Sequence, residues 1–519
     1  MKRFLNVNSK PFSVMTLLLC DFYKIDHHRQ YPKGITKVYS NWTARKSRVE
    51  GVDKVVVFGL QYFIIRYLIQ EFNQNFFALE KSEMVAEFRR VISQSLGIEN
   101  PETAHIEALH DLGYLPVEIY SLPEGYSCNI GVPSMVITNT HDDFFWLPNF
   151  LETMLSMTLW KPSTSATTAL SFRKLFVKYA KLSGEKDMGF VDYQGHDFSM
   201  RGMSAMEDFI LSGMGHLLSF NGTDTIPAIL AAEYYYGADI SKTGTSVPAT
   251  EHSVMCSGEK DGEFQTFEHL ITKIYPTGIV SIVSDTWDLW KVLTDFIPRL
   301  KNNILNRDGC VTIRPDSGDP VAITIGQNGL NFLNRLSNHD SSRGSTPADR
   351  GVLSLLAETL GFEIREAGLP PLIKNAKEIY GDSITLQRAE SILKGIVEFL
   401  GLSTYNMIFG IGSYMYEYVT RDTFGFAMKA TEIIKDGKNI PIYKDPITDN
   451  GGFKKSAKGI PVVYKSENWT ETNNDYVLVD MNTQESLEKC ELQKVFSNGT
   501  LLVVEDFAIV KERVRAQAN

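Results

Sequence analysis

The sequence predicts an α/β fold with a parallel (β/α) barrel at its centre, and two observations support this prediction. In the middle of the chain, short apolar or β-branched runs end abruptly in Gly, Asp or Arg, and a helix-like segment follows each run. Strands that alternate with helices pair in parallel, and in a closed barrel their carboxyl ends converge on one face. The flanks of the chain lack this alternation. The five strand-to-helix segments are 217–225, 278–288, 311–320, 378–384 and 406–413.

We expect the two flanks to form one α+β domain built from both chain ends. A helical run at 144–160 should break at Lys161-Pro162, because proline lacks the N–H that a helix interior needs. The other elements expected in the flanks are strands at 54–58, 117–121, 134–138, 439–443, 460–464 and 476–479, and a helix at 61–72. The predicted division assigns 156–427 to the barrel, and 1–155 together with 428–519 to the α+β domain.

Charge and cysteine content argue against several classes of protein. A net charge of −10 argues against nucleic-acid binding, although a local cluster of Lys and Arg could still bind an anionic small substrate. Five scattered cysteines without a C-x-x-C pair suggest neither a disulfide framework nor a zinc site, and they favour the cytoplasm. The apolar run at 14–20 is short, so we interpret it as a buried strand or helix start rather than a signal. No run approaches the roughly 18 apolar residues of a membrane span.

Two carboxylates follow neighbouring predicted strands. Asp285 lies in Ser-Asp-Thr-Trp-Asp, and Asp316 lies in Arg-Pro-Asp-Ser-Gly-Asp-Pro. Mg²⁺ suits such a pair, because it takes one or two protein oxygens, keeps several waters and bridges phosphates. Arg314 adds a fixed cationic fork for a phosphate or a carboxylate.

A glycine turn, Gly410-Ile411-Gly412-Ser413, ends the last predicted barrel strand. Without Cβ atoms, the backbone N–H groups of such a turn can approach an anion, and the following helix start favours negative charge. The cations downstream support a phosphate site, although each could also be an ordinary surface residue. They are Arg421, Lys429, Lys444, Lys454 and Lys455.

Three further side chains could be functional or structural. Phe198 and Arg201 are three residues apart, so on a helix or turn they could face the same way. A phenylalanine judged alone is more often part of the core. His252 is an isolated histidine, and such residues are also more often structural.

Taken in order, these motifs resemble the nicotinamide phosphoribosyltransferase family over nearly the whole chain. The resemblance begins at Asp21-Phe22-Tyr23-Lys24 and includes the full Arg-Pro-Asp-Ser-Gly-Asp-Pro run at 314–320, which is much more specific than Asp-Ser-Gly alone. It implies the irregular (β/α) barrel of type II phosphoribosyltransferases, a homodimer with active sites at the subunit interface, and a bacterial or phage-type member. The segments that carry it include 21–24, 37–40, 58–62, 115–117, 123–125, 196–202, 222–225, 246–253, 283–288, 313–320, 381–382, 409–412, 420–422 and 444–446.

The resemblance also implies a reaction and a set of roles. Nicotinamide and 5-phosphoribosyl 1-diphosphate would give nicotinamide mononucleotide and diphosphate in NAD salvage. Phe198 and Tyr23 of a second subunit would sandwich the pyridine ring, and Asp224 would accept a hydrogen bond from the carboxamide. Further expected contacts to the base, ribose and phosphates come from Asp21, Arg201, Ser246, Arg314, Gly381, Asp382, Gly412 and Ser413, and from Arg45, Arg421, Lys429, Lys444 and Lys454 of the partner chain.

The same resemblance implies two cofactor relationships. Asp285 and Asp316 would hold Mg²⁺ and diphosphate, with Arg314 beside them. His252 matches the family histidine that is phosphorylated when ATP hydrolysis is coupled to synthesis, so ATP would be an optional second substrate. Two departures matter. The run Gly410-Ile411-Gly412-Ser413 has fewer glycines than in animal members, which weakens the expected phosphate contact at Ser413, and the segment 322–379 is longer than we expect for them.

Three other functions stay open. A nicotinate phosphoribosyltransferase shares the reaction class, but Asp224 would repel a carboxylate where it attracts an amide. A barrel lyase or isomerase acting on sugar phosphates would use Mg²⁺ and the glycine turn similarly. Such enzymes usually need a central Lys or Glu base, for which the sequence offers no clear candidate. A non-catalytic binding protein is disfavoured, because every expected polar motif is present.

Overall fold

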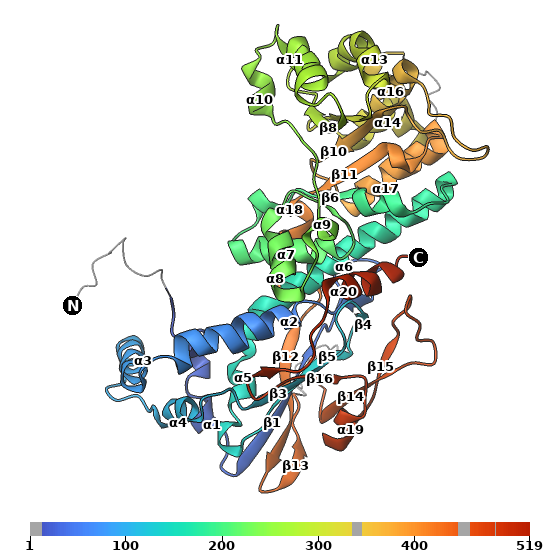
Figure 1. Ribbon diagram of the computed structural model, residues 1–519. Coiled ribbons are helices and arrows are strands. Elements are labelled where there is room, and N and C mark those ends of the chain that lie inside the picture. The colour runs from blue at the N-terminus through green and yellow to red at the C-terminus, as the bar shows by residue number, and fades with distance from the viewer. Residues whose placement is uncertain (1–12, 335–344, 445–456, 483) are drawn as a thin grey trace. The chain divides into compact units, whose positions relative to one another are not determined.

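The chain divides into two compact units in the computed structural model (Figure 1). Unit 1 comprises 1–163 and 421–505, and unit 2 comprises 164–420 and 506–519. The structure describes residues 13–334, 345–444, 457–482 and 484–519. Within these ranges, no helix combines the length and the apolar character needed to cross a bilayer.

Unit 1 is built on an antiparallel sheet that combines strands from both chain ends. In its described part, seven strands follow the order β13-β12-β1-β5-β3-β16-β17. Strand β1 pairs with β12 on one side and with β5 on the other, so Asn41 lies opposite Lys429 and also opposite Val136. The strands are β1 (Ile35–Thr43), β3 (Val117–Ser121), β5 (Pro133–Asn139), β12 (Ala427–Lys435), β13 (Lys438–Pro441), β16 (Gln493–Ser497) and β17 (Thr500–Leu501).

Two antiparallel pairs and several helices complete unit 1. The pairs are β2 (Lys54–Val56) with β4 (Ser127–Asn129), and β14 (Ile460–Lys465) with β15 (Tyr476–Asn482). The helices are α1 (His27–Gln30), α2 (Leu60–Phe63), α3 (Lys81–Leu96), α4 (Ala104–Leu112), α5 (Leu147–Phe150) and α19 (Gln484–Glu488).

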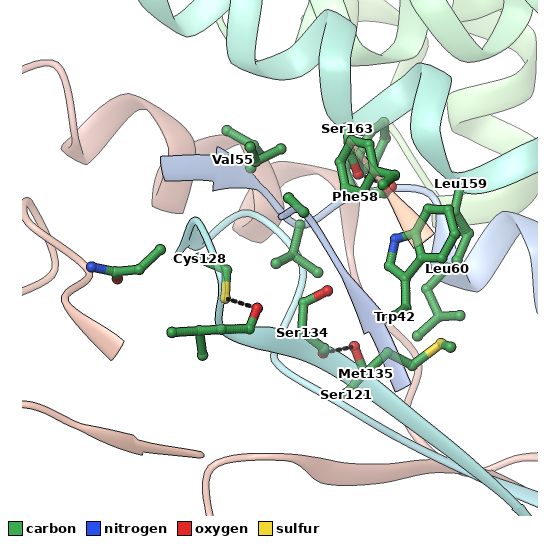
Figure 2. A pocket seen from close by; sticks show the side chains of 16 residues that line it. Trp42, Val55, Phe58, Leu60, Ser121, Cys128, Ser134, Met135, Leu159 and Ser163 are labelled. Carbon is green, nitrogen blue, oxygen red and sulfur yellow. Dashed lines mark hydrogen bonds between the residues drawn. The ribbon is translucent and has the colours of Figure 1, made fainter. Parts of the chain in front are cut away.

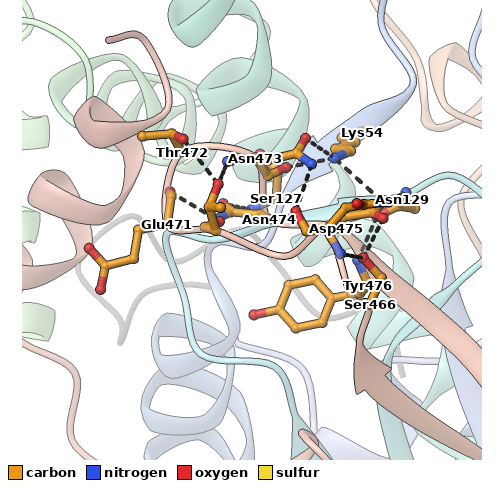
Figure 3. A network of polar contacts seen from close by, with 12 residues as sticks. Lys54, Ser127, Asn129, Ser466, Glu471, Thr472, Asn473, Asn474, Asp475 and Tyr476 are labelled. Atoms are coloured by element: carbon orange, nitrogen blue, oxygen red, sulfur yellow. Dashed lines mark hydrogen bonds and ion pairs between the residues drawn. The ribbon is translucent and has the colours of Figure 1, made fainter.

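A polar network fastens the turn between β14 and β15 to the β2–β4 pair (Figure 3). Lys54 Nζ donates to the backbone oxygen of Asn473 at 2.6 Å and to its side-chain oxygen at 2.8 Å. Asn129 Nδ2 donates to Asp475 Oδ1 at 2.8 Å, and the Ser127 N–H donates to Asn474 Oδ1 at 3.0 Å. Because these contacts join segments more than 340 residues apart, they tie the two chain ends into one unit.

The interior of unit 1 also contains a cavity of about 20 Å³ (Figure 2). Trp42, Phe58, Cys128 and Met135 are among the residues that line it. This volume can hold about one water molecule, which excludes a substrate-sized ligand.

Unit 2 is the predicted barrel. In its described part, six parallel strands follow the order β7-β6-β11-β10-β9-β8. The segment 245–250 joins the two outer strands, because Thr245 bridges to Gly222 of β7 and Ala249 bridges to Ser281 of β8. The predicted fold class, an α/β protein with an irregular (β/α) barrel, is confirmed. The strands are β6 (Gly195–Asp197), β7 (Gly222–Thr223), β8 (Gly278–Val283), β9 (Gly309–Arg314), β10 (Ala376–Tyr380) and β11 (Met407–Ile411).

Alternation along the strands separates a core face from a barrel interior. Val280, Ile282, Val311 and Ile313 are fully buried in the core between the sheet and its helices. Helices α13, α14 and α16 pack together there, and α16 contacts β10 (Figure 1). The longer helices of unit 2 are α7 (Met206–Leu217), α8 (Ile226–Tyr236), α10 (His252–Ser257), α11 (Glu263–His269), α13 (Ile297–Leu305), α14 (Pro320–Leu333), α16 (Val352–Leu360), α17 (Leu386–Lys394) and α20 (Phe507–Ala516).

Two sequence predictions about helices were wrong. The last helix, α20, belongs to unit 2 and not to the domain of the chain ends, because Lys511 Nζ donates to Asn221 Oδ1 at 2.6 Å and Arg515 pairs with Asp192 at 2.7 Å. Helix α6 (Glu152–Ser183) does not break at Pro162 but runs through it. The proline ring packs so closely on Gly59 that a Cβ there would lie 2.5 Å from it, so the ring is held against the chain while the helix continues.

Candidate functional site

The site lies where the barrel strands end. A cavity of about 610 Å³ opens there, and seven of the residues predicted from the sequence contribute to its wall. A second cavity, of about 340 Å³, fills the barrel interior and shares Phe198, Asp224 and Arg314 with the first. The wall of the first consists of Phe198, Met200, Arg201, Phe209, Asp224, Arg314, Asp316, Gly381 and Asp382.

Phe198 provides a flat apolar surface at the junction of the two cavities. Its backbone N–H donates to the Ile411 carbonyl at 3.0 Å, which continues the β6–β11 pairing by one residue. The ring lies against two glycines: a Cβ on Gly410 would be 2.3 Å from it, and a Cβ on Gly381 would be 2.9 Å away. The Arg314 guanidinium carbon is 5.2 Å from the ring centroid. These contacts fix the ring as a platform on which a planar base can stack.

Asp224 follows β7 and faces both cavities. Its Oδ1 accepts a hydrogen bond from Ser246 Oγ at 2.7 Å, and His196 Nε2 lies 3.0 Å from the same oxygen. Burial alone would raise the pKa of Asp224, but hydrogen bonds from His196 and Ser246, together with the charge of Arg314, hold it below its usual value. Asp224 is therefore ionised at neutral pH and acts as a hydrogen-bond acceptor.

Asp285 and Asp316 lie next to each other at the ends of β8 and β9. The Asp316 N–H donates to Asp285 Oδ2 at 3.0 Å. Asp285 Oδ1 is buried and has no hydrogen-bond partner among the described residues. Arg314 donates to both oxygens of Asp316, at 3.3 Å and 3.1 Å. A buried carboxylate oxygen without a partner fits a bound cation, so the residues present are suited to Mg²⁺ with water and phosphate oxygens as the other ligands.

His252 lies beside these carboxylates. Its Nε2 is 3.8 Å from Asp316 Oδ2, and its Nδ1 is 3.3 Å from Thr286 Oγ1. The side chain is 48% exposed, so solvent and ligands can reach it. The structure thus brings His252 to the mouth of the site, although the sequence places it in a different loop from both carboxylates.

The glycine turn is less closely involved than its pattern predicts. Neither Gly412 nor Ser413 lines either cavity. Among the described residues, nothing lies within 4 Å of a Cβ placed on Gly412, and its φ of −91° is open to any residue. Ser413 Oγ instead faces Gly202, where a Cβ would lie 2.3 Å away. The packing of the chain itself therefore does not require glycine at 412, and a phosphate contact there stays a prediction.

The residues predicted to act in a partner's site all belong to unit 1. Asp21 Oδ2 accepts a hydrogen bond from Thr153 Oγ1 at 2.8 Å, and Lys24 pairs with Glu152, so both sides of Tyr23 are anchored. The Tyr23 side chain itself is 59% exposed. Arg45, Arg421 and Lys429 are all exposed. Arg45 follows β1, Arg421 precedes β12, and Lys429 lies on β12. Lys444 is also exposed, and Lys454 and Lys455 lie outside the described residues.

One site residue was missed by the sequence prediction. His196 appears there only as the first residue of a matched segment, yet its ring lies 3.0 Å from Asp224. The available signal was its position: it occupies the inward-facing place of a strand that ends at the site. A polar side chain at such a position can be noticed only once the strand and its facing are known.

Comparison with known proteins agrees with this geometry. The profile of the nicotinate phosphoribosyltransferase family matches residues 193–500, and that of the nicotinamide phosphoribosyltransferase N-terminal domain matches 15–119. The chain is 46% identical to nicotinamide phosphoribosyltransferase of Acinetobacter baylyi over 517 residues, 98% of each chain. It is 32% identical to that of Mycoplasma genitalium over 461 residues, 86% of this chain and 95% of the relative.

Solved structures share the fold of this chain. Nicotinate-nucleotide pyrophosphorylase from Pyrococcus furiosus superposes with a TM-score of 0.57 over 98% of both chains, at 15% identity. Such a likeness concerns the fold, which is that of the type II phosphoribosyltransferases. On the sequence identities above, the chain belongs to the nicotinamide phosphoribosyltransferase family and is an enzyme of the pentosyltransferase class.

Proposed function

We propose that this enzyme joins nicotinamide to 5-phosphoribosyl 1-diphosphate and releases nicotinamide mononucleotide and diphosphate. The observation that carries the proposal is the placement of an ionised Asp224 beside the Phe198 platform, at the wall of the cavity that also holds Arg314 and Asp316. The pyridine nitrogen attacks the anomeric carbon of the ribose, and the bond from that carbon to the diphosphate oxygen breaks. No covalent enzyme intermediate is needed, so binding and orientation carry the catalysis.

The choice of base rests on Asp224. A carboxamide N–H can donate to its carboxylate, whereas the carboxylate of nicotinate would face it with like charge. The product ring is cationic, and a cation over the Phe198 ring gains about 0.5–2 kcal/mol. Arg201 lines the same cavity, on the side of Phe198 and Met200. We assign the ribose hydroxyls to Gly381 and Asp382, which also line it.

The leaving group is assigned to Asp285, Asp316 and Arg314. When bound, Mg²⁺ would neutralise the charge that develops on the diphosphate. The buried, unpartnered Oδ1 of Asp285 supports this assignment. Arg314 holds Asp316 by two hydrogen bonds, so the carboxylate keeps its orientation while substrate binds and leaves.

We further propose a homodimer with shared sites. In it Tyr23 of the partner chain would cover the base from the side opposite Phe198, and the partner's basic residues would bind phosphate oxygens. The anchored and exposed position of Tyr23 supports this arrangement, as does the gathering of Arg45, Arg421 and Lys429 in unit 1. We assign the enzyme to the cytoplasm, in keeping with five cysteines that form no disulfide.

ATP is proposed as an optional coupled substrate. It would transfer its terminal phosphoryl group to His252 with release of ADP, and water would later remove that group as phosphate. The half-exposed ring beside Asp316 supports the proposal, because it can be reached by a nucleotide bound at the same mouth.

The test compares the two bases on the wild-type enzyme. Purified protein is incubated with Mg²⁺, 5-phosphoribosyl 1-diphosphate and either nicotinamide or nicotinate, and the mononucleotides are quantified by mass spectrometry. We expect kcat/KM for nicotinamide to exceed that for nicotinate by at least about a hundredfold, the size expected when a carboxylate faces a carboxylate. Equal efficiency on both bases, or product from nicotinate alone, would overturn the proposal.

A further inference from the structure

We propose that His196 is a positioning residue that sets the base specificity of the site, by holding Asp224 with one carboxylate oxygen directed at the substrate. The inference rests on the proposed function. It concerns a side chain whose role neither the motifs nor the family comparisons assign. Its evidence is the arrangement of hydrogen bonds around Asp224 and the packing of the imidazole ring.

The two hydrogen bonds at Asp224 fall on the same oxygen. Ser246 Oγ donates to Oδ1 at 2.7 Å, and His196 Nε2 lies 3.0 Å from that atom. No hydrogen bond to Oδ2 occurs among the described residues. One oxygen of the carboxylate is thus used by the protein, and the other is left for a ligand in the adjoining cavities.

The imidazole ring cannot turn away from this position. The His196 backbone lies within the sheet, opposite Gly222 of β7 and Gly410 of β11. A Cβ on Gly222 would lie 2.7 Å from His196 Nδ1, so glycine at 222 makes room for the ring. On its other side the ring meets Phe198, at 5.0 Å between centroids. The side chain is 11% exposed, so neighbouring atoms fix its orientation.

This geometry defines the chemical role of the histidine. Nε2 faces an ionised carboxylate, so it carries the proton and donates it, which selects one tautomer. The hydrogen bond from His196 is the largest contribution that opposes the effect of burial on the pKa of Asp224. Without it, Asp224 would keep its bond to Ser246 but would lose both its fixed orientation and part of its preference for the charged form.

The consequence is a change in substrate discrimination. A free and more readily protonated Asp224 accepts poorly from a carboxamide, and in its acid form it can donate to the carboxylate of nicotinate. Loss of a hydrogen bond to a charged group corresponds to an effect on the order of ten- to a hundredfold in binding. His196 does not touch the reacting atoms, so we expect its loss to act mainly on KM for the base.

The test compares H196L with H196Q. Leucine removes the donor, whereas the glutamine amide places an N–H close to the position of Nε2. For H196L we expect the KM for nicotinamide to rise by about ten- to a hundredfold, kcat to change by less than about threefold, and the nicotinamide-to-nicotinate ratio of kcat/KM to fall accordingly. H196Q should recover most of that ratio, and neither variant should change the KM for 5-phosphoribosyl 1-diphosphate.

A second buried histidine gives a matched control. His216 is fully buried, bonds to the Tyr416 hydroxyl at 2.7 Å and lies 2.9 Å from the carbonyl of Gly222, but it does not contact Asp224. H216Q should therefore affect thermal stability and leave base discrimination unchanged. Nicotinamide binding by calorimetry provides the same comparison if turnover is too slow to measure. If H196L does not fold, H196N, whose shorter amide cannot reach Asp224, replaces it.

Three results would overturn the inference. They are an unchanged base ratio in H196L, an equal loss of activity on both bases, and an H196Q variant as impaired as H196L. A wild-type enzyme that does not prefer nicotinamide would instead refute the proposed function, and that result is visible before any variant is made.

Discussion

Glu378 is a single buried carboxyl group whose protonation affects the stability of the barrel. It lies on the core face of β10 and is fully buried. Thr324 Oγ1 donates to its Oε1 at 2.8 Å, while Oε2 has no partner among the described residues. Burial raises the pKa of Glu378 to about 8, and the hydrogen bond from Thr324 opposes this only in part. The side chain is therefore neutral in the folded protein at pH 7.

This shift predicts a pH-dependent contribution to stability. Below the unfolded pKa of about 4.3, Glu378 is neutral in both states, so its burial carries no ionisation cost. As the pH rises towards 8, the unfolded state loses its proton first, and stability falls. Glu378→Gln removes the ionisable group and therefore this pH dependence. The free energy of unfolding of the variant minus that of wild type should increase by on the order of 3 kcal/mol between pH 5 and pH 9. Urea denaturation at both pH values measures it.

The exposed Glu398→Gln is the control for this prediction. Glu398 is about half exposed and lies near Lys394 at 3.9 Å. Its replacement should change the free energy of unfolding by less than about 0.5 kcal/mol at either pH. If the difference in free energy of unfolding between wild type and Glu378→Gln stays constant with pH, Glu378 does not have a raised pKa.

His252 is the residue on which ATP coupling depends. His252→Ala should reduce phosphate release from ATP to background and abolish stimulation by ATP, because no other phosphoryl acceptor is proposed. Synthesis without ATP should remain measurable, since attack by the pyridine nitrogen and departure of diphosphate do not involve this ring. Both activities are measured at an unchanged melting temperature, with the exposed His269→Ala as a control. Undiminished ATP hydrolysis in His252→Ala would exclude it as the acceptor.

At the scale of single residues, the sequence predicted those site members that stand in distinctive motifs. Asp224, Asp285 and Asp316 follow strand ends, and the structure brings all three to the same face. His196 was missed, because a histidine inside a strand can be assigned to a site only when the direction of its side chain is known. The glycine at 412 was overinterpreted. A Gly-x-Gly pattern does not tell whether the space of the missing Cβ is needed by a ligand or by the packing of the chain.

At the scale of elements, the attachment of α20 to unit 2 depends on the carboxylate of Asp192. Asp192 accepts from Arg173 at 2.8 Å and from Arg515 of α20 at 2.7 Å. Asp192→Asn would leave two largely buried guanidinium groups without a counter-charge, so we expect a loss of on the order of 2–4 kcal/mol in the free energy of unfolding. Thermal or urea unfolding measures it.

A surface ion pair of unit 2 serves as the comparison. Lys178 and Glu390 are about half exposed and lie 3.1 Å apart. Lys178→Met should cost less than about 1 kcal/mol, as exposed pairs usually do. Equal effects of Lys178→Met and Asp192→Asn would show that the Asp192 cluster is no more important than a surface pair.

The elements themselves were predictable to different degrees. The segments predicted at 278–288, 311–320, 378–384 and 406–413 each overlap one barrel strand, β8 to β11, because each strand is an apolar run with a polar end. The run 217–225 was only partly a strand, since Leu217 still belongs to α7 and β7 is confined to two residues. Which unit a terminal helix joins depends on tertiary partners such as Asp192, and no local pattern carries that information.

At the scale of the whole molecule, a shared site can be tested by complementation. Tyr23→Ala and Phe198→Ala chains should each be nearly inactive as homodimers. In a mixed dimer, one site combines the intact Phe198 of one chain with the intact Tyr23 of the other. Random exchange of equal amounts should therefore restore roughly a quarter of wild-type activity. Differential tags confirm the exchange. Mixed dimers without any recovered activity would mean that each chain builds its site alone.

The pairing of β1 with β12 has a consequence for folding during synthesis on the ribosome. The Asn41 side chain bonds to Thr431, 390 residues later in the chain. At 5–20 residues per second, β1 waits about 20 to 80 s for this neighbour, with its edge unpaired. The intervening barrel strands can meet one another sooner, because most of their contacts are closer in sequence. Nascent chains arrested before residue 427 should therefore associate with chaperones or with one another through the first flank.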